Sequence, residues 1–418
     1  TWNGLYSTLK SARIIINQCS EGGIDYGNFA TKGMAEVLAA YNCALIADMF
    51  GDAPCSQAAL VDENGSPVYL TPKMDKQEEI YTQAMQYLDD AIADLQKEDL
   101  IDPGAQDLLY QGDAEKWLKL AYGLKARYTM HLLKRSANKD ADMEKVLEYV
   151  DNSFESAEEQ AAFDVYDANN INPLYGFFVA RAGLGASESM RSKLAEYNDP
   201  RLSRAFITKQ GASGKEQAPG TADNAVYAPN GSPEQGTSKY GTSLFMYSIS
   251  APTLLLSYHE LKFLEAEALC RLGRDAKSAL KDAVVAGLLN AENSFSVSRK
   301  ELGKTLINPA SSITDTEAES YFDNTIEAKY TAEPLKTTMI QKYFALWGAS
   351  GEATESYNDV RRMKGLGENF IELKNPNSFP LRCPYGNSDT TTNAEVKAAY
   401  GNGQYVYSEN VWWAGGSR

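Results

Sequence analysis

The pattern of apolar and polar positions is most regular between Pro252 and Asn290, where two apolar runs follow one another. In the first run leucines and alanines recur three or four residues apart, which places them on one face of a helix. Pro252 suits the opening turn of that helix and Gly273 suits its end. Only about three residues separate the two runs, so the sequence predicts an antiparallel helical hairpin.

Small side chains on both runs would let the two helices pack closely. They are Ala266, Ala268, Ala276, Ala279 and Ala283. Hairpins of this kind, about 34 residues long, stack in tetratricopeptide-like arrays. Because one such hairpin cannot bury its apolar stripe alone, the pattern predicts further hairpins in the chain.

Helical periodicity returns in several other segments. Residues 28–50 are apolar on two sides, which is typical of a central helix, and the helix is expected to end at the GDAP stretch that follows. With residues 75–96 it would form a second hairpin, and a third is expected from 113–135 and 141–154. Additional helices are expected at 315–330, 337–347 and 352–363. The predicted fold class is therefore mainly α, with tetratricopeptide-like helical hairpins.

Two segments, 156–251 and 366–418, have a different character. They are rich in Asn, Gly, Pro and aromatic residues, and one short helix is expected at 188–197. Loops this long are uncommon in compact domains, and the density of Tyr and Phe argues against disorder. We expect a single domain over 1–418, with a helical scaffold (1–155 and 252–365) carrying an irregular, loop-rich cap (156–251 and 366–418).

The charge of the chain excludes several functions. There are 40 basic and 56 acidic side chains, a formal net charge of -16. Such a chain repels phosphate backbones and anionic lipid, and no local basic patch offsets this, so nucleic-acid binding is not expected. No apolar run approaches the roughly 18 to 20 residues of a membrane span.

Motifs for cofactors and metals are missing from the sequence. There is no GxGxxG after a strand, no GxxxxGK[ST] loop and no GxSxG elbow, so no cofactor is expected. The five cysteines form no CxxC pair, and the two histidines, His131 and His259, lie far apart. No metal site is expected. Cys43 and Cys270 lie in helical patterns, where a small buried thiol is the usual outcome.

Several runs together resemble the SusD/RagB family. MAEVLAAYNCALIADMFGDAP (34–54) is similar to the long N-terminal helix of that family and its Phe-Gly-Asp-x-Pro stop. SYHELKFLEAEALCRLG (257–273) is similar to a later repeat helix. The runs at 198–202 (NDPRL), 340–363 and 379–393 resemble the SusD-like nutrient-binding branch. The resemblance covers almost the whole chain, in order.

This resemblance implies a surface lipoprotein of the Bacteroidetes outer membrane that binds oligosaccharides without cleaving them. It also implies a SusC-like TonB-dependent porin as partner, and membrane association through an N-terminal lipid anchor on a cysteine upstream of Thr1. The chain opens inside a helical pattern, so we expect its N-terminus to be trimmed. Cys19 is not the anchor, because the residues before it do not form a lipobox. Glycan contacts in this family follow no fixed motif, so none is transferred by position.

The chemistry of sugars narrows the candidate residues. A pyranose presents an apolar face and a rim of hydroxyls, so its site needs an exposed aromatic ring flanked by polar side chains. Two stretches qualify, 62–73 and 166–181, with Tyr227 and Tyr240 as secondary candidates. The alternative for each ring is packing of the cap onto the helices. The ligand-binding candidates are Asn64, Tyr69, Tyr166, Asn170, Asn172, Tyr175, Phe178 and Arg181.

Tryptophans outside these two stretches differ in their expected roles, and two other function classes remain alternatives. Trp117 and Trp347 lie on helical stripes and are expected in the core, whereas Trp412 and Trp413 suit either role. A helical glycoside hydrolase would need two carboxylates at a defined separation. Pairs such as Asp164 with Asp167 exist, but a solvated surface explains them more simply. A peptide-binding repeat scaffold is the third possibility.

Overall fold

The computed structural model describes residues 1–181, 184–210, 216–219, 226–231, 240–306, 309–375, 378–401, 403 and 405–418. Helices dominate these residues, which confirms the mainly α fold class. The chain forms two compact units. Unit 1 comprises Thr1–Glu155, Asn358–Asn369 and Ser378–Arg418, and unit 2 comprises Ser156–Tyr357 and Phe370–Asn377. The two segments expected to form one cap therefore belong largely to different units.

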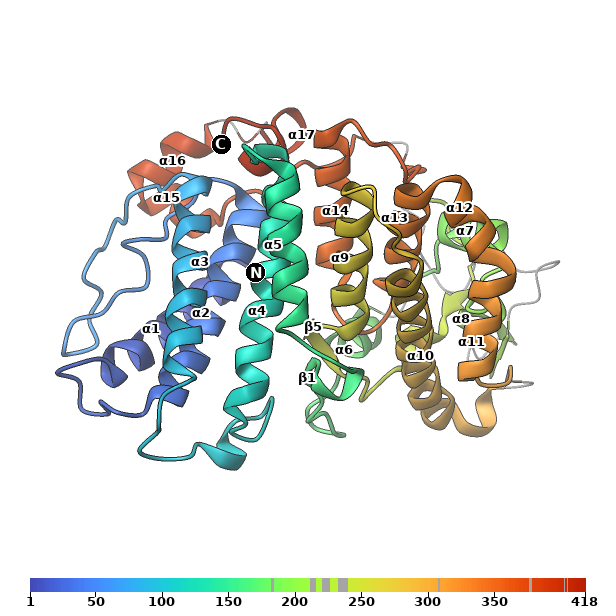
Figure 1. The fold of residues 1–418 in the computed structure, drawn as a ribbon, viewed down its shortest axis with the longest axis horizontal. Coiled ribbons are helices and arrows are strands. Elements are labelled where there is room, and N and C mark those ends of the chain that lie inside the picture. The colour runs from blue at the N-terminus through green and yellow to red at the C-terminus, as the bar shows by residue number, and fades with distance from the viewer. Residues whose placement is uncertain are drawn as a thin grey trace. The chain divides into compact units, whose positions relative to one another are not determined.

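Unit 1 is built on consecutive helices that pack pairwise, α1 on α2, α2 on α3, α3 on α4 and α4 on α5 (Figure 1). Their positions confirm the helices expected at 28–50, 75–96, 113–135 and 141–154. Its C-terminal segment adds three short helices that the sequence pattern did not predict. The helices are α1 (Trp2–Cys19), α2 (Phe29–Phe50), α3 (Gln77–Asp94), α4 (Ala114–His131), α5 (Lys139–Asp151), α15 (Asn387–Thr392), α16 (Ala394–Tyr400) and α17 (Tyr405–Ser408).

Helix α2 is the central helix of unit 1. It contacts α1, α3 and α4, so both its large-residue face and its alanine face are covered. By length and composition it is the one helix among the described residues that could cross a membrane, but 78% of its apolar window is buried in the fold. It is a core helix. It ends at Gly51, whose φ of 76° is a conformation that favours glycine.

A buried carboxylate organises the polar part of this core. Asp48 of α2 accepts hydrogen bonds from the hydroxyl of Tyr81, from Trp413 Nε1 at 3.0 Å and from Asn358 Nδ2 at 3.2 Å. The sequence left open whether Trp413 lies in the core or at a binding site. Trp413 is fully buried, so it is a core residue. Trp117 is also in the core, as expected.

Unit 2 contains the predicted hairpin as α9 (Tyr258–Arg271) and α10 (Lys277–Leu302), with α13 (Pro334–Ala345) packed on both. Two details of the prediction were wrong. Pro252 does not open the helix, because Ser257 caps it and accepts a hydrogen bond from Glu260 N at 3.0 Å. The second helix also continues twelve residues past Asn290. Unit 2 also contains α11 (Asp315–Tyr321), α12 (Glu327–Ala332) and α14 (Ala353–Leu366), the last of which continues into unit 1.

Short strands replace the start of the expected helix. β5 (Thr253–Leu256) pairs antiparallel with β1 (Ala161–Phe163), and its alternate residues Leu254 and Leu256 are buried. A second sheet has the order β3-β2-β4, with β2 (Phe206–Gln210) paired antiparallel to β3 (Glu216–Pro219) and β4 (Thr242–Ser243). Neither sheet was predicted.

Three helices lie among the described residues of the irregular segment in unit 2. α7 (Glu188–Glu196) confirms the helix expected at 188–197, whereas α6 (Pro173–Arg181) and α8 (Leu202–Ala205) were not predicted. α6 matters for function because it carries several of the candidate residues. Of its nine residues, none is fully buried.

Candidate ligand-binding sites

A long loop between α2 and α3 forms one wall of the first candidate site. Its two ends meet in an antiparallel bridge between Ala53 and Asp75. The Asp75 carboxylate accepts hydrogen bonds from Cys55 N at 2.8 Å, Ser56 N at 2.6 Å and Ser56 Oγ at 2.7 Å. Burial alone would raise the pKa of Asp75, but these hydrogen bonds outweigh it and hold the pKa below its usual range. The base of the loop is therefore fixed.

The tip of the loop is a tight turn, as the Asn-Gly pair indicated. The Asp62 carboxylate accepts hydrogen bonds from Asn64 N and Ser66 N, both at 2.9 Å, and Gly65 has a φ of 76°. Asn64 is exposed at this tip and does not line the cavity described below. It lies on the same loop as Tyr69, which does.

Arg13 of α1 holds the first half of the loop in place. Its guanidinium donates to Cys55 O at 2.8 Å, to Ala58 O and to the hydroxyl of Tyr87 at 3.1 Å. The side chain is buried, so these bonds compensate for the removal of its charge from water. The position of Ala58, which lines the cavity, thus depends on a residue of another element.

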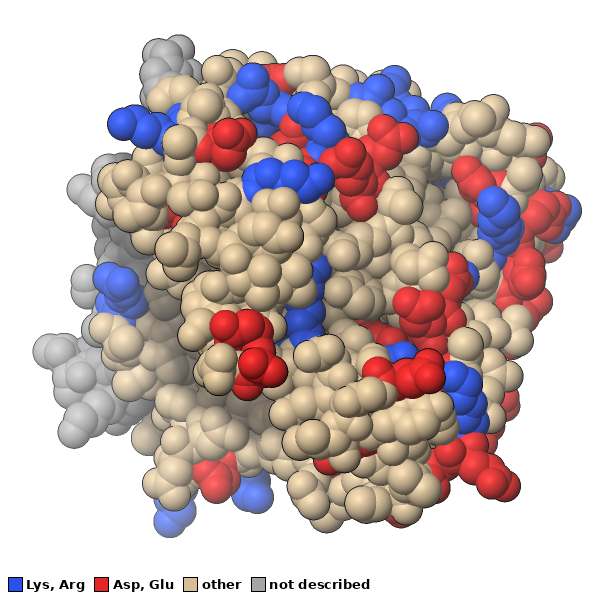
Figure 2. All heavy atoms as spheres, turned by 90° about the vertical axis from the view of Figure 1, so that its left-hand side faces the viewer, with Lys and Arg blue, Asp and Glu red and all other residues tan. Residues whose placement is uncertain are grey.

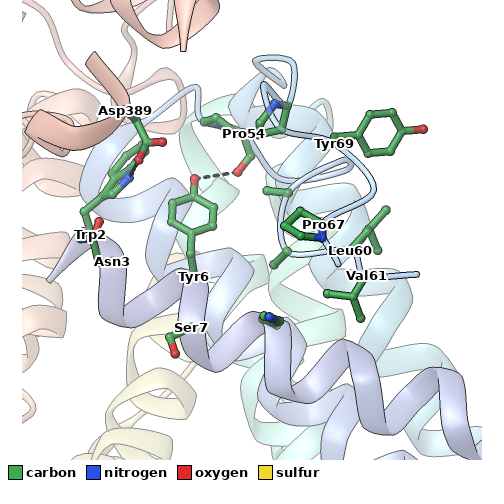
Figure 3. A pocket seen from close by; sticks show the side chains of 14 residues that line it. Trp2, Asn3, Tyr6, Ser7, Pro54, Leu60, Val61, Pro67, Tyr69 and Asp389 are labelled. Atoms are coloured by element: carbon green, nitrogen blue, oxygen red, sulfur yellow. Dashed lines mark hydrogen bonds between the residues drawn. The ribbon is translucent and has the colours of Figure 1, made fainter. Parts of the chain in front are cut away.

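A cavity of about 410 Å³ lies between this loop and α1. Figure 3 shows Trp2 and Tyr6 rising from α1 on one side, with Leu60, Val61 and Pro67 of the loop on the other. The volume falls within the usual range of ligand pockets. The lining residues are Trp2, Asn3, Tyr6, Ser7, Lys10, Pro54, Ala58, Ala59, Leu60, Val61, Pro67, Tyr69, Pro72 and Asp389.

Aromatic and polar groups share this cavity. The Trp2 ring packs 4.7 Å from Phe50 and 5.0 Å from Tyr6, and its Nε1 donates to the carboxylate of Asp389. Tyr69 is 44% exposed, and Figure 3 shows its ring on the outer side of the loop, pointing away from Trp2 and Tyr6. Asn3, Ser7 and Lys10 add exposed donors and acceptors along α1. An apolar surface bordered by such groups is the combination that a sugar ring requires.

Of the aromatic residues that line this cavity, Tyr69 was a candidate from the sequence, whereas Trp2 and Tyr6 were not. Both lie in the first turns of α1, whose periodicity indicated only a helix. Their spacing of four residues places them on one face, which was the available signal.

Figure 2 turns the side of the molecule that carries α1 and α16 towards the viewer. Uncharged side chains cover much of the centre of that view, but basic atoms lie in a central hollow with acidic groups close by, and further charged groups lie along the top and right.

The second candidate stretch, 166–181, lies in unit 2. Asn172 was expected to bind ligand, and the structure contradicts this. Its side chain is fully buried: Nδ2 donates to Ala251 O at 2.8 Å and Ala349 O at 3.1 Å. Oδ1 accepts from Leu174 N at 2.8 Å, at the start of α6. The amide of Asn172 therefore anchors the helix and is enclosed away from ligand.

The other residues before α6 are more accessible. Tyr166 is half-buried and shares a 2.7 Å hydrogen bond with Thr253 Oγ1. Asn170 is exposed, with its Nδ2 donating to Val165 O at 3.1 Å. Backbone N–H groups of Asn170 and Asn169 lower the pKa of Asp167, so this carboxylate serves the turn.

On α6 itself the exposed ring is Phe177 rather than Phe178. Phe178 packs edge-on against Tyr247 at 5.1 Å, whereas Phe177 is 50% exposed and lies 5.7 Å from the guanidinium of Arg181. Tyr175 is half-buried, and its hydroxyl donates to Glu301 at 3.2 Å. Burial, together with Glu301, raises the pKa of Tyr175. The secondary candidates Tyr227 and Tyr240 are both buried.

Comparisons with known proteins agree with the fold. Residues 1–385 match a family model, SusD-like, described as "Starch-binding associating with outer membrane". The structure is similar to a SusD/RagB family protein from Bacteroides thetaiotaomicron, with 67% identity and a TM-score of 0.95, covering 100% of this chain and 87% of that one. No curated protein matches the sequence.

More distant structures share the fold alone. A chitin-binding protein is 21% identical with a TM-score of 0.74, over 99% of this chain and 87% of that one. A chitin-binding SusD homolog from Flavobacterium johnsoniae is 20% identical with a TM-score of 0.70, over 99% of this chain and 86% of that one.

Proposed function

Since the chain belongs to the SusD/RagB family, we propose that it is a non-catalytic, surface-exposed lipoprotein that binds an oligosaccharide. It would deliver this ligand to a SusC-like TonB-dependent transporter in the outer membrane. The description of the family model as starch-binding and associating with the outer membrane supports glycan binding and the location. The names of the two chitin-binding proteins that share the fold support glycan binding.

The observation that carries the proposal is the cavity between α1 and the loop after α2. It combines the ring of Tyr6, and the exposed ring of Tyr69 at its rim, with the hydroxyl, amide and ammonium groups of Ser7, Asn3 and Lys10. A saccharide would stack its C–H face on an aromatic ring and place its hydroxyls against these groups. Because the loop is tied down at its base and by Arg13, the wall is preformed and little ordering entropy is lost on binding.

The same cavity favours binding over hydrolysis. Glycoside hydrolases that use protein carboxylates need two of them on either side of the scissile bond. Among the described residues that line this cavity, Asp389 is the one carboxylate, and it accepts the indole N–H of Trp2. Capture by stacking and hydrogen bonding, followed by release to the transporter, requires no proton transfer.

A panel of neutral oligosaccharides tests the proposal. Maltooligosaccharides and chitooligosaccharides would be titrated into the protein by calorimetry, and each mixture would then be assayed for new reducing ends. We expect saturable binding of at least one oligosaccharide and no increase in reducing ends. New reducing ends would identify a hydrolase, and affinity for peptides in place of every glycan would favour the scaffold alternative.

A further inference from the structure

Unit 2 contains a second and larger cavity, of about 1200 Å³, which has no residue in common with the first. It is lined by α7, by residues 226–230, by parts of α12 and α13, and by residues 370–374. Aromatic side chains form much of its wall, and Ser189, Ser192 and Asn230 contribute polar groups. The aromatic lining residues are Tyr197, Tyr227, Tyr240, Phe344 and Phe370.

Charged side chains also line this cavity, and most of its acidic groups already have a basic partner. Glu333 pairs with Lys336 at 2.9 Å, Glu372 pairs with Lys374, and Glu188 pairs with Arg191 at 3.3 Å. These pairs neutralise three of the four carboxylates that line the cavity. Glu196, the fourth, is exposed.

Two lysines in the lining have no such partner. Neither Lys193 nor Lys329 forms an ion pair with a carboxylate in the part of the chain that the structure describes. Lys193 Nζ donates to Ser189 Oγ at 2.7 Å, and Lys329 Nζ lies 4.4 Å from the centre of the Tyr197 ring. Both side chains are half-buried. Burial lowers the pKa of Lys193, and the attraction of Glu372 and Glu196 offsets this only in part because Lys374 opposes it.

The wall of the cavity contains one more group without a partner. Tyr227 is 4% exposed, and its buried hydroxyl makes no hydrogen bond with any described residue. Buried polar atoms are rarely left unsatisfied in native proteins, and a bound water or ion is one explanation for an exception. Unpaired ammonium groups and an unpaired hydroxyl therefore occur together in the lining of one cavity.

We propose that this cavity in unit 2 binds an acidic saccharide whose carboxylate or sulfate group is held by Lys193 and Lys329. An anion would supply the hydrogen bond to a charged acceptor that both ammonium groups lack. Aromatic rings and the hydroxyls of Ser189 and Ser192 suit the remainder of a sugar. That the ligand is a saccharide rests on the proposed function, whereas its negative charge rests on the two lysines. The chain carries a net charge of -16, so such a site would select anions against the field of the whole protein.

Calorimetric titration with matched trisaccharides tests this inference. The probes are trigalacturonic acid, a sulfated galactose trisaccharide, and neutral maltotriose. We expect at least one acidic trisaccharide to bind, and Lys193→Gln and Lys329→Gln each to weaken that binding about tenfold or more, as for loss of a hydrogen bond to a charged group. The preferred acid distinguishes a carboxylate ligand from a sulfate ligand.

Lys300→Gln is the matched control. Lys300 is an exposed lysine of α10 in the same unit and lies outside the cavity, so this variant loses the same charge. Melting curves confirm that each variant is folded. The inference is overturned if neither acid binds more tightly than maltotriose, or if Lys193→Gln and Lys329→Gln bind the acid as well as Lys300→Gln does.

The outcome separates this site from the first cavity. Tyr69→Ala alters only the cavity of unit 1, so it should leave the affinity for the acidic trisaccharide unchanged. If all neutral oligosaccharides fail to bind while an acidic one binds through Lys193, the site in unit 2 stands and the first cavity does not. The reverse result removes the acidic site and leaves the proposed function intact.

Discussion

The hydroxyl of Tyr6 donates a 2.6 Å hydrogen bond to the carbonyl of Pro54, which joins α1 to the beginning of the loop after α2. Arg13, seven residues further along α1, binds the carbonyls of Cys55 and Ala58 on the same loop. Because both contacts run between α1 and one short stretch of loop, the shape of the cavity between them depends on α1. A substitution in α1 can therefore change the loop wall without touching a ligand.

Tyr6→Phe tests the contribution of the first contact. The Pro54 carbonyl belongs to a buried residue, so loss of the hydroxyl leaves it unpaired. We expect the free energy of unfolding to fall by about 1 to 2 kcal/mol, measured by urea denaturation. Tyr407→Phe removes a hydroxyl from a tyrosine that is 60% exposed and serves as the control. Equal stability of the two variants would show that the hydrogen bond does not hold the loop.

Arg13→Gln should be more damaging. The change leaves the carbonyls of Cys55 and Ala58 without their donor in the interior, which costs about 1 to 3 kcal/mol for each unsatisfied group. A drop in the melting temperature well beyond that of Lys10→Gln, an exposed lysine on the same helix, is the expected result. A melting temperature within a degree or so of that control would argue that the loop is held by its base alone.

Asn172→Ala and Tyr175→Ala should separate a structural role from a binding role. Asn172→Ala removes the amide that pairs with two buried carbonyls and with the start of α6, so we expect about 2 kcal/mol of lost stability.

Tyr175→Ala removes a half-buried ring and should change the melting temperature little while weakening glycan binding if α6 contributes to the site. A large loss of stability in Tyr175→Ala would place that ring in the core.

Glu36 predicts a pH dependence of stability. Burial in α2 raises its pKa from 4.5 to about 7, despite the ion pair with Lys32 at 3.2 Å. Above pH 4.5 the unfolded chain loses this proton while the folded chain keeps it until about pH 7. The stability contribution of the neutral carboxyl is therefore present at pH 4 and lost as the pH rises towards 7, by an amount on the order of 3 kcal/mol.

Glu36→Gln keeps the side chain neutral at every pH, so it should raise the melting temperature at pH 8 and have little effect at pH 4. Glu21→Gln, at an exposed position in the α1–α2 connection, controls for the loss of one charge. If Glu36→Gln and the natural protein show parallel profiles of melting temperature from pH 4 to 8, Glu36 is ionised in the folded state.

The helical scaffold was predictable because periodicity is a local property. α2 was located within one residue, since its alanines and large apolar residues repeat over six turns and Gly51 ends it. The error at Pro252 has a local cause too, because the sequence of β5 is short and apolar and does not differ from the start of a buried helix. Only its pairing with β1, about 90 residues earlier in the chain, makes it a strand.

The site was less predictable because its character depends on tertiary partners. Asn170 and Asn172 are the same residue type in the same polar stretch, so the sequence does not distinguish them. Asn172 is buried and donates to the carbonyls of Ala251 and Ala349, whereas Asn170 is exposed. Trp2 and Tyr6 contribute to a cavity only because the loop after α2 is held against α1. No pattern within a single segment carries this information.

A crystal structure of the protein soaked with the tightest-binding neutral oligosaccharide of the panel tests the central claim most directly. The account predicts density for an intact saccharide in the cavity between α1 and the loop after α2, with a sugar ring against Tyr69 and hydroxyls near Asn3 or Ser7. Density for the saccharide only at other places, with this cavity empty at saturating ligand, would contradict it.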